Sequence, residues 1–334
     1  MHMADALLSP SVGLVMAAVT IGAIAYSVNK IKKDESFDEK KIPIMAVSGA
    51  FIFAAQMINF TIPGTGSSGH IGGGILLAAL LGPFPALLTM AAVLIIQCLF
   101  FADGGLLALG ANIFNMGVIV SFVSYPLIFK PIVSKGLTPK RITLATIAAV
   151  VIGLQLGAFS VVLETMASGI TELPFHVFLL LMQPIHLVIG LTEGVVTAAV
   201  LCFIYSMRPE IMEGALTNKS IGSKSIKKVL IALGIFTILL AAGFSLLASS
   251  FPDGLEWAIG NITGGGEIEK AGNVYNVFGE IQELFAFMPD YSLKTNPEQG
   301  TSLAGIIGGT LTLVLAGVTG IVINVMKKRK VAKR

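Results

Sequence analysis

Charged residues are scarce in this sequence, and their scarcity excludes a large soluble protein. Only 12% of the 334 residues are Asp, Glu, Lys or Arg, while 54% are hydrophobic. A typical soluble domain carries about 25% charged residues, so too few remain here to cover a large soluble core. Instead, apolar runs of 18 or more residues recur, each long enough to cross roughly 30 Å of hydrocarbon as a helix.

Cysteine is scarce as well, and several chemical functions lack their usual residues. Cys98 and Cys202 lie far apart within apolar runs, which indicates packing and argues against a disulfide or a metal site. The net charge is only +3, and the basic residues lie at the ends of apolar runs, so nucleic-acid binding is not expected. There is no G-x-x-x-x-G-K-[ST] phosphate loop and no evident pair of nucleophile and base. We predict a protein that is not an enzyme.

The apolar runs predict an all-α, polytopic helical membrane protein with about nine transmembrane helices, because a spanning helix satisfies its own backbone hydrogen bonds. The predicted spans are 9–28, 43–60, 71–82, 85–101, 105–129, 142–163, 185–206, 229–250 and 303–325. The third span is too short to cross alone, and Gly82-Pro83-Phe84-Pro85 separates it from the fourth. We expect a short or partly re-entrant third helix, which leaves the count open by one or two.

Basic residues predict the orientation of the chain. Lys and Arg cluster after the first, fifth, seventh and ninth spans, and such loops favour the cytoplasmic side. With nine spans, all of these segments fall on one side, which places the N-terminus outside and the C-terminus inside. No Lys or Arg precedes the first span, so we expect no cleaved signal peptide and a Met1 that stays in place on the outside of the cell membrane.

Three parts follow from this pattern. Residues 1–207 form a predicted seven-helix unit, and 208–225 form a polar cytoplasmic linker. Residues 226–334 form a predicted two-helix hairpin around a long acidic outer loop, 251–302.

The beginning of the chain carries a pattern for metal binding. The Met1 amine, the His2 backbone nitrogen and the His2 Nδ1 can close fused chelate rings on one metal ion. Such nearly planar nitrogen ligands suit a d⁸ ion such as Ni²⁺, for which square-planar coordination is diagnostic. A fourth nitrogen ligand is then required.

His70 can supply the fourth nitrogen. It lies in a glycine-rich stretch, 61–74, that is expected on the same outer side as Met1, and glycines allow close backbone approach. An ionisable residue at this depth is a functional candidate. Each histidine also has an ordinary explanation, namely chance for His2 and a helix cap or carbonyl contact for His70. The spacing of the two histidines alone does not decide between metal binding and these ordinary explanations.

Further polar residues lie in apolar surroundings and could orient the imidazoles. They are Gln56, Asn59, Asp103, Asn112 and Asn115. For any one of them, a hydrogen bond that joins two helices is the better explanation. His186 and Glu193 lie seven residues apart on one helix face, and we expect a packed polar pair there.

A stripe of small residues marks the second span. Ala46, Ala50 and Ala54 are spaced by four, which lets helices approach closely. The stripe could therefore face another subunit.

These segments resemble the CbiM/NikM family, the substrate-specific components of energy-coupling-factor (ECF) transporters for cobalt and nickel. The resemblance covers residues 1–207 and is carried by Met1-His2-Met3-Ala4-Asp5 and by the stretches 61–74, 103–115 and 186–194. The second part resembles the PDGLE domain, a partner module of this family, through Pro252-Asp253-Gly254-Leu255-Glu256-Trp257.

The resemblance implies a metal ion held by the Met1 amine, the His2 amide and imidazole, and the His70 imidazole. This ion, Ni²⁺ or Co²⁺, would be the transported substrate, with no permanent cofactor. The resemblance also implies partners in separate chains, namely a transmembrane coupling (T) subunit against the alanine stripe and two cytoplasmic ATPase subunits. The PDGLE hairpin would assist metal loading or transport. Square-planar ligation and the PDGLE fusion favour nickel over cobalt.

Two other functions stay open at this point. One is a secondary metal/proton carrier with Glu193 and His186 as a relay within the membrane, which would transport metal without partners. The other is a structural or regulatory subunit whose acidic outer hairpin binds metal loosely. That subunit would tolerate His2→Ala.

Overall fold

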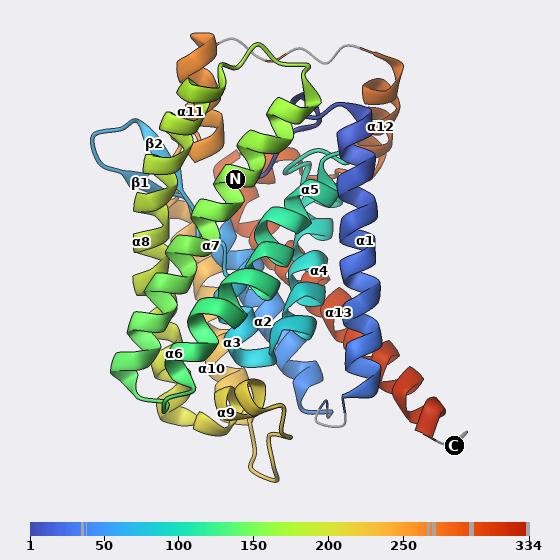
Figure 1. Ribbon diagram of the computed structural model, residues 1–334, viewed down its shortest axis with the longest axis vertical. Coiled ribbons are helices and arrows are strands. Elements are labelled where there is room, and N and C mark those ends of the chain that lie inside the picture. Colours follow the sequence, from blue (N-terminus) through green and yellow to red (C-terminus); the bar gives the residue numbers. More distant parts are fainter. Residues whose placement is uncertain (35–36, 38, 266–267, 269–271, 294–296, 332–334) are drawn as a thin grey trace.

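The computed structural model describes residues 1–34, 37, 39–265, 268, 272–293 and 297–331. They form a bundle of helices (Figure 1), which confirms the all-α prediction. The body of the bundle consists of α1 (Pro10–Lys33), α2 (Lys41–Gln56), α3 (Gly74–Leu81), α4 (Pro83–Phe101), α7 (Pro139–Ser168), α8 (Phe175–Met207), α10 (Lys227–Ala242) and α13 (Pro297–Val331). Between α4 and α7, α5 (Leu109–Ile113) continues through the π-helical segments Phe114–Val118 and Val120–Phe129 into α6 (Lys130–Val133).

Six helical segments of the described chain are long and apolar enough to cross a membrane. They are Pro10–Lys33, Pro83–Phe101, Leu109–Val133, Pro139–Ser168, Phe175–Met207 and Gly300–Arg329. The helices α2 and α10 have 16 residues each, and α3 has 8. The short third helix is as expected, and all of its residues are buried. The chain is a multi-pass membrane protein, but these short helices do not confirm nine full crossings.

Two helix boundaries differ most from the prediction. The helix α8 begins at Phe175 rather than at residue 185, and it runs through Pro184. A proline is tolerated within a membrane helix, and beside it the Gln155 amide of α7 donates to the Gln183 carbonyl of α8 at 2.9 Å, which joins the two helices. The helix α10 ends at Ala242, and the tighter turn Phe244–Leu247 follows it.

The predicted linker 208–225 contains a helix, α9 (Pro209–Thr217). It begins on a proline at its first position, where the missing N–H costs no hydrogen bond. Ile211 and Met212 of α9 are buried, and the helix contacts α3 and α8. Half of this segment is therefore part of the packed bundle.

The predicted acidic loop 251–302 contains two further helices, α11 (Gly254–Thr263) and α12 (Asn273–Phe285). Tyr275 of α12 donates to the Leu8 carbonyl at 2.8 Å, and Gln282 donates to the Cys98 carbonyl at 2.9 Å. This loop is thus built onto the end of the first unit that also holds the two-stranded hairpin of β1 (Phe60–Ile62) and β2 (Ser67–Gly69).

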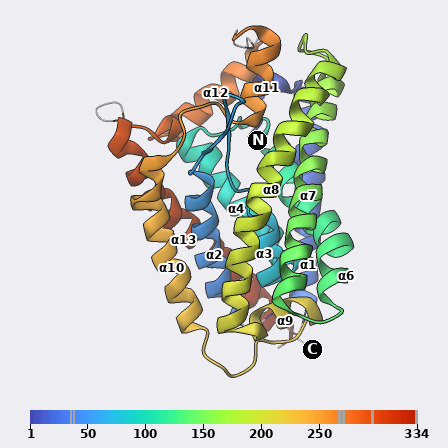
Figure 2. The ribbon, with the colours of Figure 1, turned by 90° about the vertical axis from the view of Figure 1, so that its left-hand side faces the viewer.

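The two ends of the bundle differ. The helices α11 and α12 lie at one end, whereas α9, the α6–α7 turn and the C-terminal ends of α1 and α13 lie at the other (Figures 1 and 2). The basic segments identified in the sequence therefore gather at one end, as the positive-inside pattern requires.

The alanine stripe of α2 lies against α13 of the same chain. Ala46, Ala50 and Ala54 are 7%, 3% and 0% exposed, and α2 lies beside α13 and α10 (Figure 2). Glycines on α13 permit this approach, since a Cβ at Gly308 would lie 2.0 Å from the ring of Phe53. The prediction that the stripe faces another subunit therefore needs correction, because small residues of both helices already pack together there.

Candidate metal site

The first nine residues form a segment that is fixed inside the bundle. Asn112 holds the Met3 backbone at both ends, because its side-chain oxygen accepts from the Met3 N–H at 2.7 Å and its amide donates to the Met3 carbonyl at 3.1 Å. Asp5 accepts from the Ala108 N–H at 3.0 Å. Met1 is 5% exposed, so the N-terminus is a buried structural element.

Glycine allows the loop after α4 to lie against this segment. The Gly105 N–H donates to the Met3 carbonyl at 2.9 Å. A Cβ at Gly105 would lie 1.8 Å from the Asp5 carboxylate oxygen and 2.4 Å from the Asp5 backbone nitrogen. A side chain at position 105 is therefore incompatible with the seated N-terminal segment.

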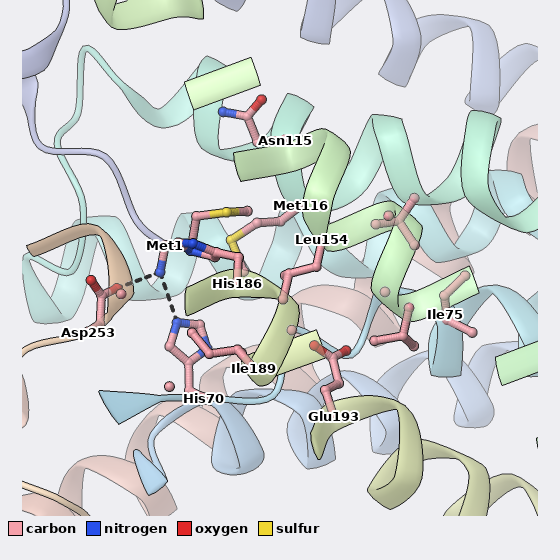
Figure 3. Close-up of a pocket in the computed structure, with 17 residues that line it drawn as sticks. Met1, His70, Ile75, Asn115, Met116, Leu154, His186, Ile189, Glu193 and Asp253 are labelled. Carbon is pink, nitrogen blue, oxygen red and sulfur yellow. Dashed lines mark hydrogen bonds and ion pairs between the residues drawn. The ribbon is translucent and has the colours of Figure 1, made fainter. Parts of the chain in front are cut away.

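The structure brings Met1, His2 and His70 together. The Met1 amine lies 3.1 Å from Nε2 of His70 and 2.5 Å from Oδ2 of Asp253 (Figure 3). The rings of His2 and His70 stack, with centroids 5.3 Å apart and an interplanar angle of 14°. All three residues that the sequence singled out thus meet around one point.

The hairpin β1–β2 and the turn after it position His70. A Cβ at Gly69 would lie 2.5 Å from the Ile189 side chain, so only glycine lets β2 pass this close to α8. Gly73 has a φ of +79°, which favours glycine, and its N–H donates to Glu193 at 2.8 Å. His70 is therefore held between a strand packed on α8 and a turn bonded to the same helix.

Two of the four expected nitrogen donors contact carboxylates. Nδ1 of His2 lies 3.1 Å from Oδ1 of Asp103, and the Met1 amine contacts Asp253 as described. Tyr291 donates to the other oxygen of Asp103 at 2.5 Å. Asp253 and Tyr291 belong to the second unit of the chain, so both units contribute to this site.

Burial decides the protonation of the two histidines. It lowers the pKa of His2 and of His70 to about 3, and the nearby Met1 ammonium acts in the same direction. Both imidazoles are therefore neutral at pH 7, which is the state that binds metal. Burial alone would raise the pKa of Asp253, but the adjacent ammonium outweighs it and holds that pKa below its usual range. Asp253 is thus a carboxylate.

Several cavities adjoin the site. One of about 40 Å³ is lined by Met1, His70, His186 and Glu193 among others (Figure 3). Another, of about 530 Å³, is lined by His2 and by five carboxylates: Asp5, Asp103, Asp253, Glu256 and Asp290. A concentration of negative charge in a cavity raises the local concentration of cations.

The other predicted polar residues take different roles. Asp103 contacts an imidazole, and Asn59 lines a third cavity with His2 and His70. Asn112 holds the backbone of Met3, and Asn115 donates to Glu164 at 2.8 Å.

His186 and Glu193 do not form the expected pair in the described structure. Nδ1 of His186 contacts the Met182 carbonyl at 2.7 Å, while Glu193 accepts from the Gly73 N–H.

Within the described ranges, no three side chains of His, Cys, Asp or Glu form a set that could hold a metal ion. A metal at this site would therefore depend on terminal or main-chain nitrogen. The sequence did not place Asp253 or Tyr291 here. Asp253 and Glu256 have the spacing of a helix capping box, which predicts the start of a helix. That spacing gives no information on the contact of Asp253 with the distant Met1 amine.

Comparison with known proteins confirms the resemblance. Residues 2–211 match the family described as the cobalt uptake substrate-specific transmembrane region (CbiM), and residues 227–325 match the PDGLE domain. The putative fused nickel transport protein NikMN of Archaeoglobus fulgidus is 32% identical over 94% of this chain and 96% of its own length. The fused nickel transport protein NikMN of Rhodobacter capsulatus is 28% identical over 95% and 96%.

More distant or shorter relatives match the first unit. The cobalt transport protein CbiM of Sorangium cellulosum is 30% identical over 64% of this chain and 95% of its own. A crystal structure of a truncated transition metal transporter, 33% identical, superposes with a TM-score of 0.54 over 62% of this chain and 99% of that chain. The protein therefore belongs to the CbiM family of metal-transport membrane proteins and carries a fused PDGLE domain.

Proposed function

We propose that this chain is the substrate-binding transmembrane subunit of an ATP-driven ECF transporter that imports Ni²⁺ across the cell membrane. The ion is held by the Met1 amine, the His2 amide nitrogen, the His2 Nδ1 and the His70 Nε2. Once bound, it is the cargo of the transporter.

The observation that carries this proposal is the 3.1 Å between the Met1 amine and Nε2 of His70. In a square-planar complex with metal–nitrogen bonds of about 2.0 Å, adjacent nitrogens lie about 2.8 Å apart. The two nitrogens, 69 positions apart in sequence, are therefore already close to the separation that adjacent ligands require.

One donor must turn before the set is complete. Nδ1 of His2 contacts Asp103. The imidazole therefore has to rotate about the Cα–Cβ and Cβ–Cγ bonds before Nδ1 can bind the ion. The amine and the backbone amide must each release a proton, which makes binding pH-dependent.

Separate chains supply the energy in this proposal. The sequence has no phosphate loop, so two cytoplasmic ATPase subunits and a transmembrane coupling subunit complete the transporter. Because α13 covers the alanine stripe of α2, the coupling subunit binds a different face of the bundle, or α13 moves aside.

Nickel is favoured over cobalt by two independent arguments. The ligand set is planar and rich in nitrogen, which suits a d⁸ ion. In addition, two relatives that match at least 94% of this chain are named as nickel transport proteins, whereas the CbiM of Sorangium cellulosum, named for cobalt, matches 64%.

The test measures Ni²⁺ in the purified protein that begins at Met1, beside His2→Ala, His70→Ala and a variant with one residue added before Met1. We expect stoichiometric Ni²⁺ and a square-planar absorbance in the wild type and loss of both in the three variants. The control is His176→Ala, an exposed histidine at the start of α8, which should keep the metal. Metal retained in all variants would refute the site, and tighter binding of Co²⁺ than of Ni²⁺ would reassign the cargo.

A further inference from the structure

The carboxylate of Asp253 joins the two units of the chain at the metal site. Its Oδ1 accepts from the N–H groups of Leu255 and Glu256 at 2.8 and 2.9 Å and so caps α11. Its Oδ2 accepts from the Met1 amine at 2.5 Å. One oxygen thus fixes the carboxylate to its own helix, while the other reaches the first residue of the chain (Figure 3).

The segment that carries Asp253 is docked on the hairpin that carries His70. The Ser68 N–H donates to the Pro252 carbonyl at 2.8 Å, and its hydroxyl donates to the Phe251 carbonyl at 2.7 Å. The indole of Trp257 donates to the Thr65 carbonyl at 2.9 Å. These bonds fix Asp253 relative to His70, so its position beside the Met1 amine is built into the fold.

The charge of the proposed chelate needs a partner at this position. Ni²⁺ bound to one deprotonated amide and three neutral nitrogens carries a net charge of +1, and a charge in buried surroundings is costly unless it is paired. In the structure, the charges of the Met1 ammonium and the Asp253 carboxylate already cancel. When Ni²⁺ enters, one proton leaves the amine and one leaves the amide for water, so the summed charge of these groups and Asp253 remains zero.

The amine can keep its contact with Asp253 in both states. A metal-bound primary amine retains two N–H groups, and one of them can still donate to Oδ2. A carboxylate that accepts a hydrogen bond from a metal ligand orients that ligand.

We propose that Asp253 is a positioning residue for the transported metal, an inference that rests on the proposed function. It holds the Met1 amine beside His70 before the ion arrives and supplies the negative charge that neutralises the chelate afterwards. The PDGLE domain thereby contributes a defined charged group to the metal site of the first unit. Neither neighbouring carboxylate takes this role, because Asp103 faces His2 and Tyr291, and Glu256 accepts from the Asp253 N–H.

The experiment compares Ni²⁺ affinity, by competition with a chelator of known affinity, in the full chain and in Asp253→Asn. Asparagine caps a helix as well as aspartate does, so this change removes the charge and retains the cap. We expect affinity to fall by ~10- to 100-fold while the absorbance maximum of bound Ni²⁺ stays the same, because the four nitrogens are unchanged. A merely structural role would alter that spectrum.

Two further variants make the result specific. Asp253→Ser also caps a helix but cannot reach the amine, so it should weaken binding to a similar extent. Glu283→Gln removes one negative charge from an exposed position on α12 and should leave affinity unchanged.

Unchanged or tighter binding in Asp253→Asn, with metal lost in His2→Ala, would overturn this inference alone. Tighter binding would identify Asp253 as a competitor for the amine. A wild-type protein without affinity for Ni²⁺ would overturn the proposed function as well.

Discussion

A single methyl group at Gly105 is expected to weaken ion binding at the proposed metal site without touching any proposed ligand. The Cβ of Gly105→Ala would lie 1.8 Å from a carboxylate oxygen of Asp5 and 2.4 Å from its backbone nitrogen. Ordinary van der Waals contacts begin near 3.4 Å. The backbone of Asp5 therefore has to move by about 1 Å, and Met1 and His2 move with it because they are part of the same short segment.

The magnitude follows from the contacts that are lost. Overpacking of this kind costs ~1–3 kcal/mol, and the bond between Asp5 and the Ala108 N–H, which contributes ~1 kcal/mol, is strained or broken. Displacement of residues 1–5 removes the overlap at the lowest cost in free energy. The penalty therefore lowers the affinity for the metal. A loss of about 2 kcal/mol corresponds to roughly 30-fold weaker affinity.

The assay is a Ni²⁺ titration of Gly105→Ala beside Gly279→Ala. Gly279 lies inside α12, and a Cβ there meets no atom within 4 Å. The control therefore makes the same chemical change but should stabilise the helix slightly, by about 0.5–1 kcal/mol, and leave affinity unchanged. If Gly105→Ala bound Ni²⁺ as tightly as the wild type, the fixed N-terminal segment would have no part in metal capture.

Three further predictions test other parts of the structure. Asn112→Ala leaves the buried Met3 N–H without its acceptor and should cost ~1–3 kcal/mol, seen as a lower thermal unfolding midpoint in detergent together with weaker Ni²⁺ binding; an unchanged midpoint would contradict the role of Asn112. Ala46→Leu overpacks the contact of α2 with α13, because a Cβ at Gly317 would already lie 3.4 Å from the Cβ of Ala46, and should lower the same midpoint through ~1–3 kcal/mol of strain, whereas no change would mean that α13 does not occupy this face. Because the pKa values of His2 and His70 fall from 6.5 to about 3 on folding, the unfolded chain binds more protons between these values, so their contribution to stability is complete above pH 6.5 and is lost as the pH falls toward 3. Histidine ¹⁵N NMR of the metal-free protein should show both rings neutral at pH 5, and a charged ring at that pH would refute this.

The sequence predicted the features that depend on local composition. Continuous apolar runs predicted α1, α4 and α7, because lipid allows few alternatives to a helix. The glycine-rich stretch predicted that His70 could approach Met1, and in the structure the two meet. These inferences needed only the chemistry of neighbouring residues and the side of the membrane.

The features that the sequence did not predict are contacts between distant segments. Asp253 and Met1 lie 252 positions apart, and no periodicity relates them. The helices α11 and α12 were missed because an acidic segment outside the membrane has no long apolar run. The alanine stripe was assigned to another subunit because small residues predict close packing but do not identify the helix that packs against them. For Asp253 and for the alanine stripe the local pattern was correct, and only the tertiary structure identifies the partner.

The N-terminal segment also has a consequence for how the protein is made. Residues 1–9 are held by hydrogen bonds with residues that are synthesised much later. Tyr275 donates to the Leu8 carbonyl, and Asp253 accepts from the Met1 amine. Contacts between such distant positions form slowly, because a long stretch of chain must close first. The segment that emerges before the rest of the chain is therefore among the last to reach its final place, and until Asp253 and Tyr291 have reached theirs, the proposed site for the ion is incomplete.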